Sequence, residues 1–324
     1  MGVAPIALFT YNRSEHLQLT LEALKRCDLA NESDLYVFSD APKTAEGEVA
    51  VTKVRDVLAR IDGFASVKVV ARQHNFGLAS SIISGVTELC RIHGQVIVLE
   101  DDLVVSPAFL RFMNEALRQY RDQNSVMQVS GYVLPMPRIT QLGDTFMCRV
   151  PTSWGWATWD RAWKYFNQDS GWLLAQLSSA TLRQRFDVDG TYPYLEMLQQ
   201  HAEGRLDVWG VRWYASMFLE EGLCIYPTES LVQNIGMDGS GMHCDASTRF
   251  DVRLSTKDRW RFTQAIEESH VAVEMFSQFF RTMRAQNNTA ATTSFSPWFR
   301  RVTGKWHSMV GRVRSSSSGR RKVQ

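Results

Sequence analysis

Apolar and polar positions along the first hundred residues form a pattern that predicts four strands, each followed by a helix. Apolar runs of four to seven residues, rich in Val, Ile, Leu and Phe, end in polar residues and predict strands at 3–9, 35–38, 67–71 and 95–99. Between the runs, apolar residues recur every three or four positions, which predicts helices that pack by one face. Because strands and helices alternate, we expect an α/β fold with a mostly parallel central sheet flanked by helices.

Polar residues follow each predicted strand. They are Asn12-Arg13, Ser39-Asp40, Arg72 to Asn75, and Glu100-Asp101-Asp102. The carboxyl ends of parallel strands meet at one edge of an open α/β sheet, and ligands bind at that edge. The four groups are therefore expected to lie together, where one nucleotide could span them.

Three consecutive carboxylates end the fourth strand, at Glu100, Asp101 and Asp102. Adjacent like charges raise the pKa of at least one acid unless a cation is present. A hard divalent ion takes one or two carboxylates and lets phosphate oxygens complete its shell. The alternative is that the acids merely end the strand in water. Ser106 and Pro107, read as an N-cap and a first helical residue, place a helix directly after the acids and favour a site. Ser14 is read as the cap of the first helix.

Several function classes are disfavoured by what the sequence lacks. There is no G-x-x-x-x-G-K-[ST] loop and no G-x-G-x-x-G after the first strand, which weighs against a P-loop NTPase and a nicotinamide dehydrogenase. No apolar run approaches the ~20 residues of a membrane span. The first residues lack the basic start of a signal peptide, and the five scattered cysteines have no metal-ligand spacing. These features predict a cytoplasmic protein with reduced thiols.

The second half is rich in tryptophan. Trp154, Trp156, Trp159 and Trp163 fall within ten residues, with Gly155 among them. Such a cluster forms either a platform on which sugar rings stack or part of the core. Farther on, His243 ends a glycine-rich loop and is either a late metal ligand or a surface histidine.

The chain after residue 245 differs from the body. Helices are expected at 260–268 and 271–283, within a helical extension at 246–286, followed by a polar linker at 287–296. Residues 297–324 carry eight basic residues and no acid. The remaining 28 basic residues face 34 acidic ones, so residues 1–296 have a net charge of −6. The basic tail therefore calls for a separate explanation.

The tail has the pattern of a helix that lies in a membrane surface. At ~100° per residue, its large apolar residues share one face and its basic residues the rest. The apolar positions are Phe295, Trp298, Phe299, Val302, Trp306, Met309, Val310 and Val313. We expect this helix to contact anionic lipid, or else to dock on the protein itself. A nucleic-acid role is not expected, because no reading fold accompanies the charges.

Taken together, these motifs resemble those of bacterial GT-A glycosyltransferases, near family 2, and of the Golgi N-acetylglucosaminyltransferase that acts on mannose. The matching pieces cover roughly residues 3–245. They are Phe9 to Arg13, Ser39-Asp40, Asn75 to Ala79, Leu99 to Leu103, Ser153 to Trp159, Asp207 to Tyr214, and Asn234 to His243. The resemblance implies a GT-A domain at 1–245, with a nucleotide-binding half at about 1–130 and an acceptor half at about 131–245.

The resemblance also implies roles for individual residues. Asp102 would hold Mn²⁺ or Mg²⁺, with His243 as a further ligand, and Asp207 would be the general base of an inverting transfer. Trp154, Gly155, Trp156 and Trp209 would contact the sugar substrates. The nucleotide-sugar donor would be bound by Thr10, Tyr11, Asn12, Arg13, Ser39, Asp40, Asn75, Gly77, Leu78, Glu100 and Asp101.

The activity implied is transfer of a sugar from a nucleotide-diphosphate sugar, for which we expect a UDP-sugar. The acceptor would be a hydroxyl of a glycan or lipid-linked molecule in cell-surface polysaccharide synthesis, at the inner face of the cytoplasmic membrane. Two alternatives remain open. One is a sugar-1-phosphate nucleotidyltransferase, which would need a glycine-rich loop after the first strand. The other is a non-catalytic protein that binds nucleotide-sugars or glycans and would tolerate loss of Asp102 and Asp207.

Overall fold

The computed structural model describes residues 2–239 and 247–291. Its centre is an eight-stranded sheet of order β3-β2-β1-β4-β8-β6-β9-β7. β1 (Ile6–Thr10) lies between β2 (Asp34–Ser39) and β4 (Gln95–Glu100) and runs parallel to both. β3 (Ser66–Ala71) pairs in parallel with β2 at the sheet edge. The four predicted strands are thus confirmed as one parallel block.

The other half of the sheet is mixed. β8 (Trp156–Trp159) runs antiparallel between β4 and β6 (Val126–Ser130). β9 (Leu223–Pro227) is parallel to β6, and β7 (Thr145–Cys148) closes the sheet antiparallel to β9. Six of the eight strands therefore share one direction, which confirms the predicted mostly parallel α/β sheet.

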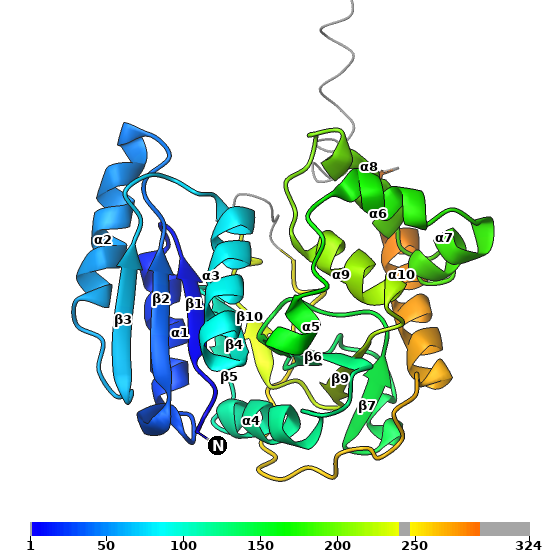
Figure 1. Ribbon diagram of the computed structural model, residues 1–324, viewed down its shortest axis with the longest axis horizontal. Coiled ribbons are helices and arrows are strands. Elements are labelled where there is room, and N and C mark those ends of the chain that lie inside the picture. The colour runs from blue at the N-terminus through cyan, green and yellow to red at the C-terminus, as the bar shows by residue number, and fades with distance from the viewer. Residues whose placement is uncertain (1, 240–246, 292–324) are drawn as a thin grey trace, which may run out of the picture.

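Helices cover both faces of the sheet. α1 (Ser14–Lys25) and α2 (Glu48–Leu58) pack together on one face, while α3 (Leu78–His93) lies against β1 and β4 on the other (Figure 1). α4 (Phe109–Gln119) packs on β6 and β8. The second half adds five short helices, α5 (Asp160–Trp163), α6 (Ser170–Gln176), α7 (Ala180–Phe186), α8 (Tyr194–Ala202) and α9 (Gly210–Leu219). Across the described residues, no helix is both long enough and apolar enough to span a bilayer.

A small two-stranded ribbon joins distant parts of the chain. β5 (Leu103–Val105) follows the acidic residues directly and pairs antiparallel with β10 (Val232–Asn234). The pairing places Asn234 opposite Leu103. The segment after β10 is therefore held beside the end of β4.

Two predicted helix caps are wrong. α1 has Arg13 at its N-cap and α4 has Ala108, and neither helix end has a side-chain cap. Ser106 instead ends the β5–β10 ladder, because its backbone N–H donates to Leu231 O at 2.9 Å. Its buried hydroxyl has no hydrogen-bond partner among residues 2–239 and 247–291.

The C-terminal extension packs on the domain rather than following it. α10 (His270–Ala291) lies against β7 and contains the predicted helix at 271–283. It also includes residues 287–291, which were predicted as linker. Residues 297–324, the predicted membrane helix, lie outside the described residues.

The helix predicted at 260–268 is absent. This stretch is extended, and Trp260 and Phe262 both contact the Phe112 ring of α4, at centroid distances of 4.9 and 5.5 Å. Backbone N–H groups here donate to side chains: Arg261 N to Asp144 Oδ2 and Thr263 N to Thr145 Oγ1, both at 2.9 Å. Tertiary packing thus overrides the helical periodicity.

Candidate active site

The acidic residues lie at the carboxyl end of β4, where the predicted site was expected. Asp101 is buried, and its Oδ2 accepts hydrogen bonds from Thr10 Oγ1 at 2.7 Å and from Tyr11 N at 3.1 Å. Thr20 Oγ1 on α1 donates to the Asp101 carbonyl at 2.9 Å. Asp101 therefore fixes the loop after β1 to the end of β4, so two of the predicted strand ends meet.

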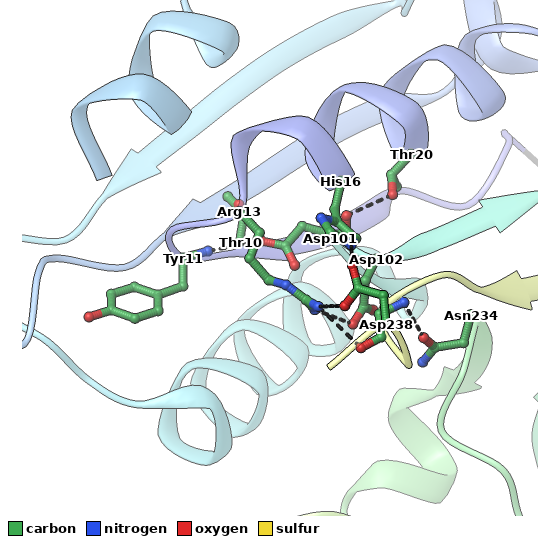
Figure 2. A network of polar contacts seen from close by, with 10 residues as sticks. Thr10, Tyr11, Arg13, His16, Thr20, Asp101, Asp102, Asn234 and Asp238 are labelled. Atoms are coloured by element: carbon green, nitrogen blue, oxygen red, sulfur yellow. Dashed lines mark hydrogen bonds and ion pairs between the residues drawn. The ribbon is translucent and has the colours of Figure 1, made fainter. Parts of the chain in front are cut away.

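Asp102 lies beside a guanidinium group. Arg13 Nη1 is 2.8 Å from Asp102 Oδ2, and Arg13 Nη2 contacts Gly236 O at 3.1 Å and Asp238 Oδ1 at 3.3 Å. His16 Nε2 reaches the other oxygen of Asp238 at 3.1 Å. Figure 2 shows these side chains converging from α1, the end of β4 and the segment after β10.

The segment after β10 approaches Asp102 so closely that a larger residue at Gly236 would displace the side chains of Asp102 and Arg13. Ile235 N donates to the Asp102 carbonyl at 2.8 Å, and Gly236 N donates to Asn234 Oδ1 at 2.7 Å. A methyl group on Gly236 would overlap the Asp102 carboxylate and lie 2.7 Å from Arg13 Nη1. The backbone and the charged pair are therefore packed as one unit.

Negative charge exceeds positive charge at this edge. Burial, together with the charges of Asp102 and Asp101, raises the pKa of Glu100 well above its ordinary value. Burial and the Asp102 charge raise the pKa of Asp101 to about 6. Burial also raises the pKa of Asp102, although the adjacent Arg13 opposes that change. One guanidinium does not offset three acids, so the site favours a further cation.

The carboxylates suit a hard divalent ion, but they do not form a closed cage. Within 2–239 and 247–291, no group of three or more His, Cys, Asp or Glu side chains is arranged to hold a metal ion. Asp102 and Asp238 converge on Arg13 and offer oxygens at one point. Such a set fits an ion that takes one or two protein oxygens and completes its shell with phosphate. His243, the other predicted ligand, lies outside the described residues.

Asp40 organises a loop rather than facing an open site. Its Oδ1 accepts from Ala41 N and Phe76 N at 2.9 and 2.8 Å, and its Oδ2 accepts from Gly77 N at 2.9 Å. Asn75 Nδ2 donates to Ala41 O at 2.7 Å. Asp40 thus ties the strand end of β2 to the start of α3, and its base-binding role stays a prediction.

The remaining predicted donor-binding residues surround that loop. Gly77 has φ +74° and open space at the Cβ position, and Leu78 after it is half exposed at the first turn of α3. Ser39 is fully buried, so its hydroxyl cannot face a ligand. The Tyr11 hydroxyl accepts from Lys43 N at 3.0 Å. Asn12 is half-buried between Tyr11 and Arg13.

The tryptophan cluster is mainly core. Trp156 belongs to β8, is 1% exposed and stacks on the Trp209 ring at a centroid distance of 5.1 Å. Trp209 is also buried, so both rings belong to the core, and the substrate role expected for Trp156 and Trp209 stays a prediction. Trp154 is only half-buried, against Tyr132 and Phe250. Gly155 adopts φ +63° next to it.

Asp207, the predicted base, lies on the loop before α9, and its side chain is 74% exposed. His201 Nε2 is 4.0 Å from its Oδ1. Burial and the Arg212 charge lower the pKa of His201, which favours the neutral imidazole. Asp207 lines a cavity of about 570 Å³ along α3. No described contact links Asp207 to the residues around Asp102.

Sequence reasoning missed four residues of these two regions: His16, Gly236, Asp238 and Arg212. His16 follows Arg13 by three positions, a spacing that places two residues on one side of a helix and could have indicated it. Asp238 and Gly236 belong to the glycine-rich loop that was noted only for its histidine. Arg212 had no signal beyond its place in the motif around Asp207.

Comparison with known proteins gives structural neighbours, including the two that follow. No protein-family model matches the chain, and no curated protein matches it. One solved neighbour is the mannosyltransferase PcManGT from Pyrobaculum calidifontis in complex with GDP-Man and Mn²⁺. It is 12% identical, with a TM-score of 0.35, over 67% of this chain and 74% of that one.

A second neighbour is S. aureus TarS, which is 15% identical, with a TM-score of 0.26, over 39% of this chain. The match spans 21% of TarS. With identities and TM-scores this low, the chemistry of the site rests on its own residues. Those residues form an acidic edge of a mostly parallel α/β sheet, where the excess negative charge favours binding of a cation.

Proposed function

We propose that this protein is a glycosyltransferase of the GT-A type that uses a nucleotide-diphosphate sugar as donor. The observation that supports it most directly is the convergence of Asp102, Arg13 and Asp238 at the carboxyl end of β4. Acids there can hold a divalent ion, while the guanidinium offers N–H donors to phosphate oxygens. Of the two neighbours named above, PcManGT is a mannosyltransferase that was solved with GDP-Man and Mn²⁺.

The reaction needs charge stabilisation on the leaving side. When a nucleoside diphosphate leaves the anomeric carbon, negative charge develops on its phosphate oxygens, and preorganised cations near them lower the barrier. Asp102 would hold Mn²⁺ or Mg²⁺, with Asp238 nearby, and the ion would supply Lewis-acid stabilisation of the diphosphate. Arg13 is placed to donate to the same group once its contacts with Asp102 and Asp238 rearrange.

On the acceptor side, we assign Asp207 as the general base of an inverting transfer. Its carboxylate is exposed in a cavity, as a group that meets an incoming hydroxyl must be. Removing the hydroxyl proton is worth about 10²–10⁴-fold in rate. The acceptor would be a hydroxyl of a glycan or lipid-linked molecule in cell-surface polysaccharide synthesis.

The test is a donor screen. The full-length protein with Mn²⁺ would be incubated with UDP-, GDP- and dTDP-sugars, and release of free nucleoside diphosphate would be followed with and without EDTA. We expect EDTA-sensitive hydrolysis of one donor, with a UDP-sugar as the first candidate. The proposal would be overturned if the protein neither bound nor turned over any of these donors.

Two matched variants sharpen the screen. Asp102→Asn removes the charge at the proposed ion site and should reduce turnover at least 100-fold. Asp122→Asn removes the charge of an exposed acid that pairs with Arg121, and it should not affect turnover. Full turnover by Asp102→Asn would exclude this carboxylate from the reaction. Binding of a donor without turnover in the wild type would favour the non-catalytic alternative.

A further inference from the structure

The cavity beside Asp207 contains a buried arginine without a matching acid. Arg212 on α9 is 6% exposed and lines this cavity of about 570 Å³. Its Nε donates to Val208 O at 3.3 Å, and its guanidinium carbon is 6.0 Å from the Phe166 ring centre. Among the described residues, no carboxylate forms an ion pair with it within 4.0 Å. Its terminal N–H groups therefore remain available to the cavity.

Arg149 shows how this chain otherwise treats a buried guanidinium. Arg149 is 5% exposed, and Glu268 Oε2 and Asp189 Oδ1 lie 2.7 and 3.2 Å from its nitrogens. Buried charges are normally paired in this way, because an isolated buried charge is costly. Among the described residues, Arg212 has no carboxylate within 4.0 Å. The acid whose charge acts on it is Asp207, and because that side chain is 74% exposed, an anion that enters the cavity can take the place of a close partner.

The wall opposite Arg212 is one polar face of α3. Ser80, Ser84, Thr87 and Arg91 recur at helical spacing and line the cavity. This face extends over about 16 Å at 1.5 Å per residue. It begins in the first turn of α3, directly after the loop that Asp40 holds. The Ser84 hydroxyl donates to Ser81 O at 3.1 Å, and the Thr87 hydroxyl accepts from Trp163 Nε1 at 2.8 Å. The hydroxyls of Ser80 and Thr87 are therefore the ones that can still donate to a sugar.

The charges in the cavity have unequal exposure. Glu88, Arg91 and Asp207 also line it, but the Asp207 side chain is 74% exposed and Arg91 is exposed, so water solvates both. Arg212 is removed from water, and burial lowers its pKa. A hydrogen bond from a desolvated guanidinium to an anionic oxygen is stronger than one from an exposed arginine.

We propose that this cavity binds the acceptor sugar through an anionic group, a carboxylate or a phosphate, held by the terminal N–H groups of Arg212. The inference rests on the proposed function, because it places the acceptor hydroxyl near Asp207 and the anionic group of the same sugar near Arg212. A cavity of this volume is typical of small-molecule sites, which range over roughly 300–1,000 Å³.

The test is direct binding to the full-length protein in EDTA, measured by saturation-transfer-difference NMR. The probes are D-glucuronate, D-glucose 6-phosphate and, as the neutral control, D-glucose. We expect at least one anionic probe to bind ten-fold or more tighter than glucose. Whichever of D-glucuronate and D-glucose 6-phosphate binds more tightly shows whether the site prefers a carboxylate or a phosphate. Equal binding of all three sugars would overturn the proposal.

Variants locate the binding group. Arg212→Gln should reduce binding of the preferred anion at least ten-fold, whereas Arg91→Gln, at the exposed end of the same cavity, should reduce it less than three-fold. Unchanged binding in Arg212→Gln, or a larger loss in Arg91→Gln, contradicts the assignment.

A second measurement avoids any loss of fold in Arg212→Gln. The Nε–H resonance of Arg212, assigned by its absence in Arg212→Lys, should shift when the preferred anion is titrated into the wild type. An unmoved resonance at saturation rules the site out. The donor screen is independent of both results. Arg212-dependent binding without donor turnover contradicts the proposed function. Donor turnover without such binding contradicts this inference.

Discussion

Asp101 and Asp102 are adjacent in the chain, yet their carboxylates do different work. Asp101 faces inward and accepts hydrogen bonds from Thr10 and Tyr11, so it joins two strand ends. Asp102 faces Arg13 and the segment after β10. Neighbouring residues at a strand end point to opposite sides, which separates a scaffold role from a ligand-binding role.

Because the pKa of Asp101 is raised in the folded protein, ionisation of this carboxyl group destabilises the folded state. Its folded pKa of about 6 lies above the ordinary 3.8. The folded state therefore holds this proton more tightly than the unfolded state does. The resulting stability is full below about pH 4 and is lost as pH rises through 6.

Asp101→Asn should therefore stabilise the protein at neutral pH. Asparagine retains an oxygen for Thr10 and Tyr11 but carries no charge. We expect a gain of about 1–3 kcal/mol at pH 7.5 and little gain at pH 4, because a pKa change of one corresponds to about 1.4 kcal/mol. Urea denaturation in EDTA at both pH values measures it. A gain that is equal at both would show that the charge is not the cause.

At the scale of elements, the β5–β10 ribbon carries the segment containing Gly236 to the acidic edge. Gly236 has no room for a side chain, since a methyl group would overlap the Asp102 carboxylate. That carboxylate cannot move aside freely, because it pairs with Arg13. The ribbon and the charged pair are thus coupled through one glycine.

Gly236→Ala should separate the segment after β10 from Asp102. We expect donor turnover to fall at least ten-fold while the fold is retained, because the clash lies at the surface end of the ribbon. Gly210→Ala is the matched control: Gly210 begins α9 with no atom within 4 Å of the Cβ position, and alanine favours the helix by up to ~1 kcal/mol. Equal activity in both variants would contradict the coupling. Far-UV circular dichroism and thermal melting check the fold of each.

Secondary-structure elements could be predicted from the sequence where the local pattern of apolar residues agrees with the tertiary packing. The four parallel strands and α3 follow from apolar runs and helical spacing. Ser106 fails as a cap because its N–H belongs to the β5–β10 ladder, a pairing with Leu231 more than a hundred residues away. Trp156 was ambiguous because its aromatic neighbours suit either a platform or a core, and only strand pairing with β4 and β6 decides. The contact of Asp238 with Arg13 is likewise long-range.

At the scale of the whole molecule, the C-terminal extension completes the core. The domain boundary at 245 stays a prediction, and Trp260, Phe276 and Phe280 beyond it are all buried against earlier residues. Glu268 also pairs with the buried Arg149 at 2.7 Å. Removing the extension would expose apolar surface and leave the buried Arg149 with Asp189 alone as its acidic partner.

Truncation after residue 247 should therefore prevent stable folding. Each large apolar side chain exposed costs roughly 1.5–3 kcal/mol, against a total stability of roughly 5–15 kcal/mol. Truncation after residue 291 keeps these contacts and serves as the control. Thermal melting and size-exclusion chromatography compare the two. A cooperative, monomeric 1–247 fragment would support the predicted boundary.

The basic tail also concerns the whole molecule, because we propose that it holds the protein at a membrane surface. We expect the full chain to sediment with vesicles containing an anionic phospholipid, and to be released by salt, while residues 1–291 stay in solution. Each Lys or Arg near an anionic surface contributes about 1 kcal/mol. Neutral vesicles are the control, and equal sedimentation of the two chains would exclude the tail as a membrane anchor.

The pairing of β5 with β10 also sets an order of events during synthesis. β5 leaves the ribosome about 130 residues before β10, so its edge has no partner while the intervening chain is made. Until that partner emerges, Asp102 lacks the backbone that later surrounds it, and Arg13 has no Gly236 carbonyl to hold. A nascent chain thus carries the acidic strand end early, but the contacts of Arg13 beside Asp102 are complete only after Gly236 and Asp238 have emerged. Premature termination before β10 would release a chain that lacks both the segment beside Asp102 and the extension that completes the core.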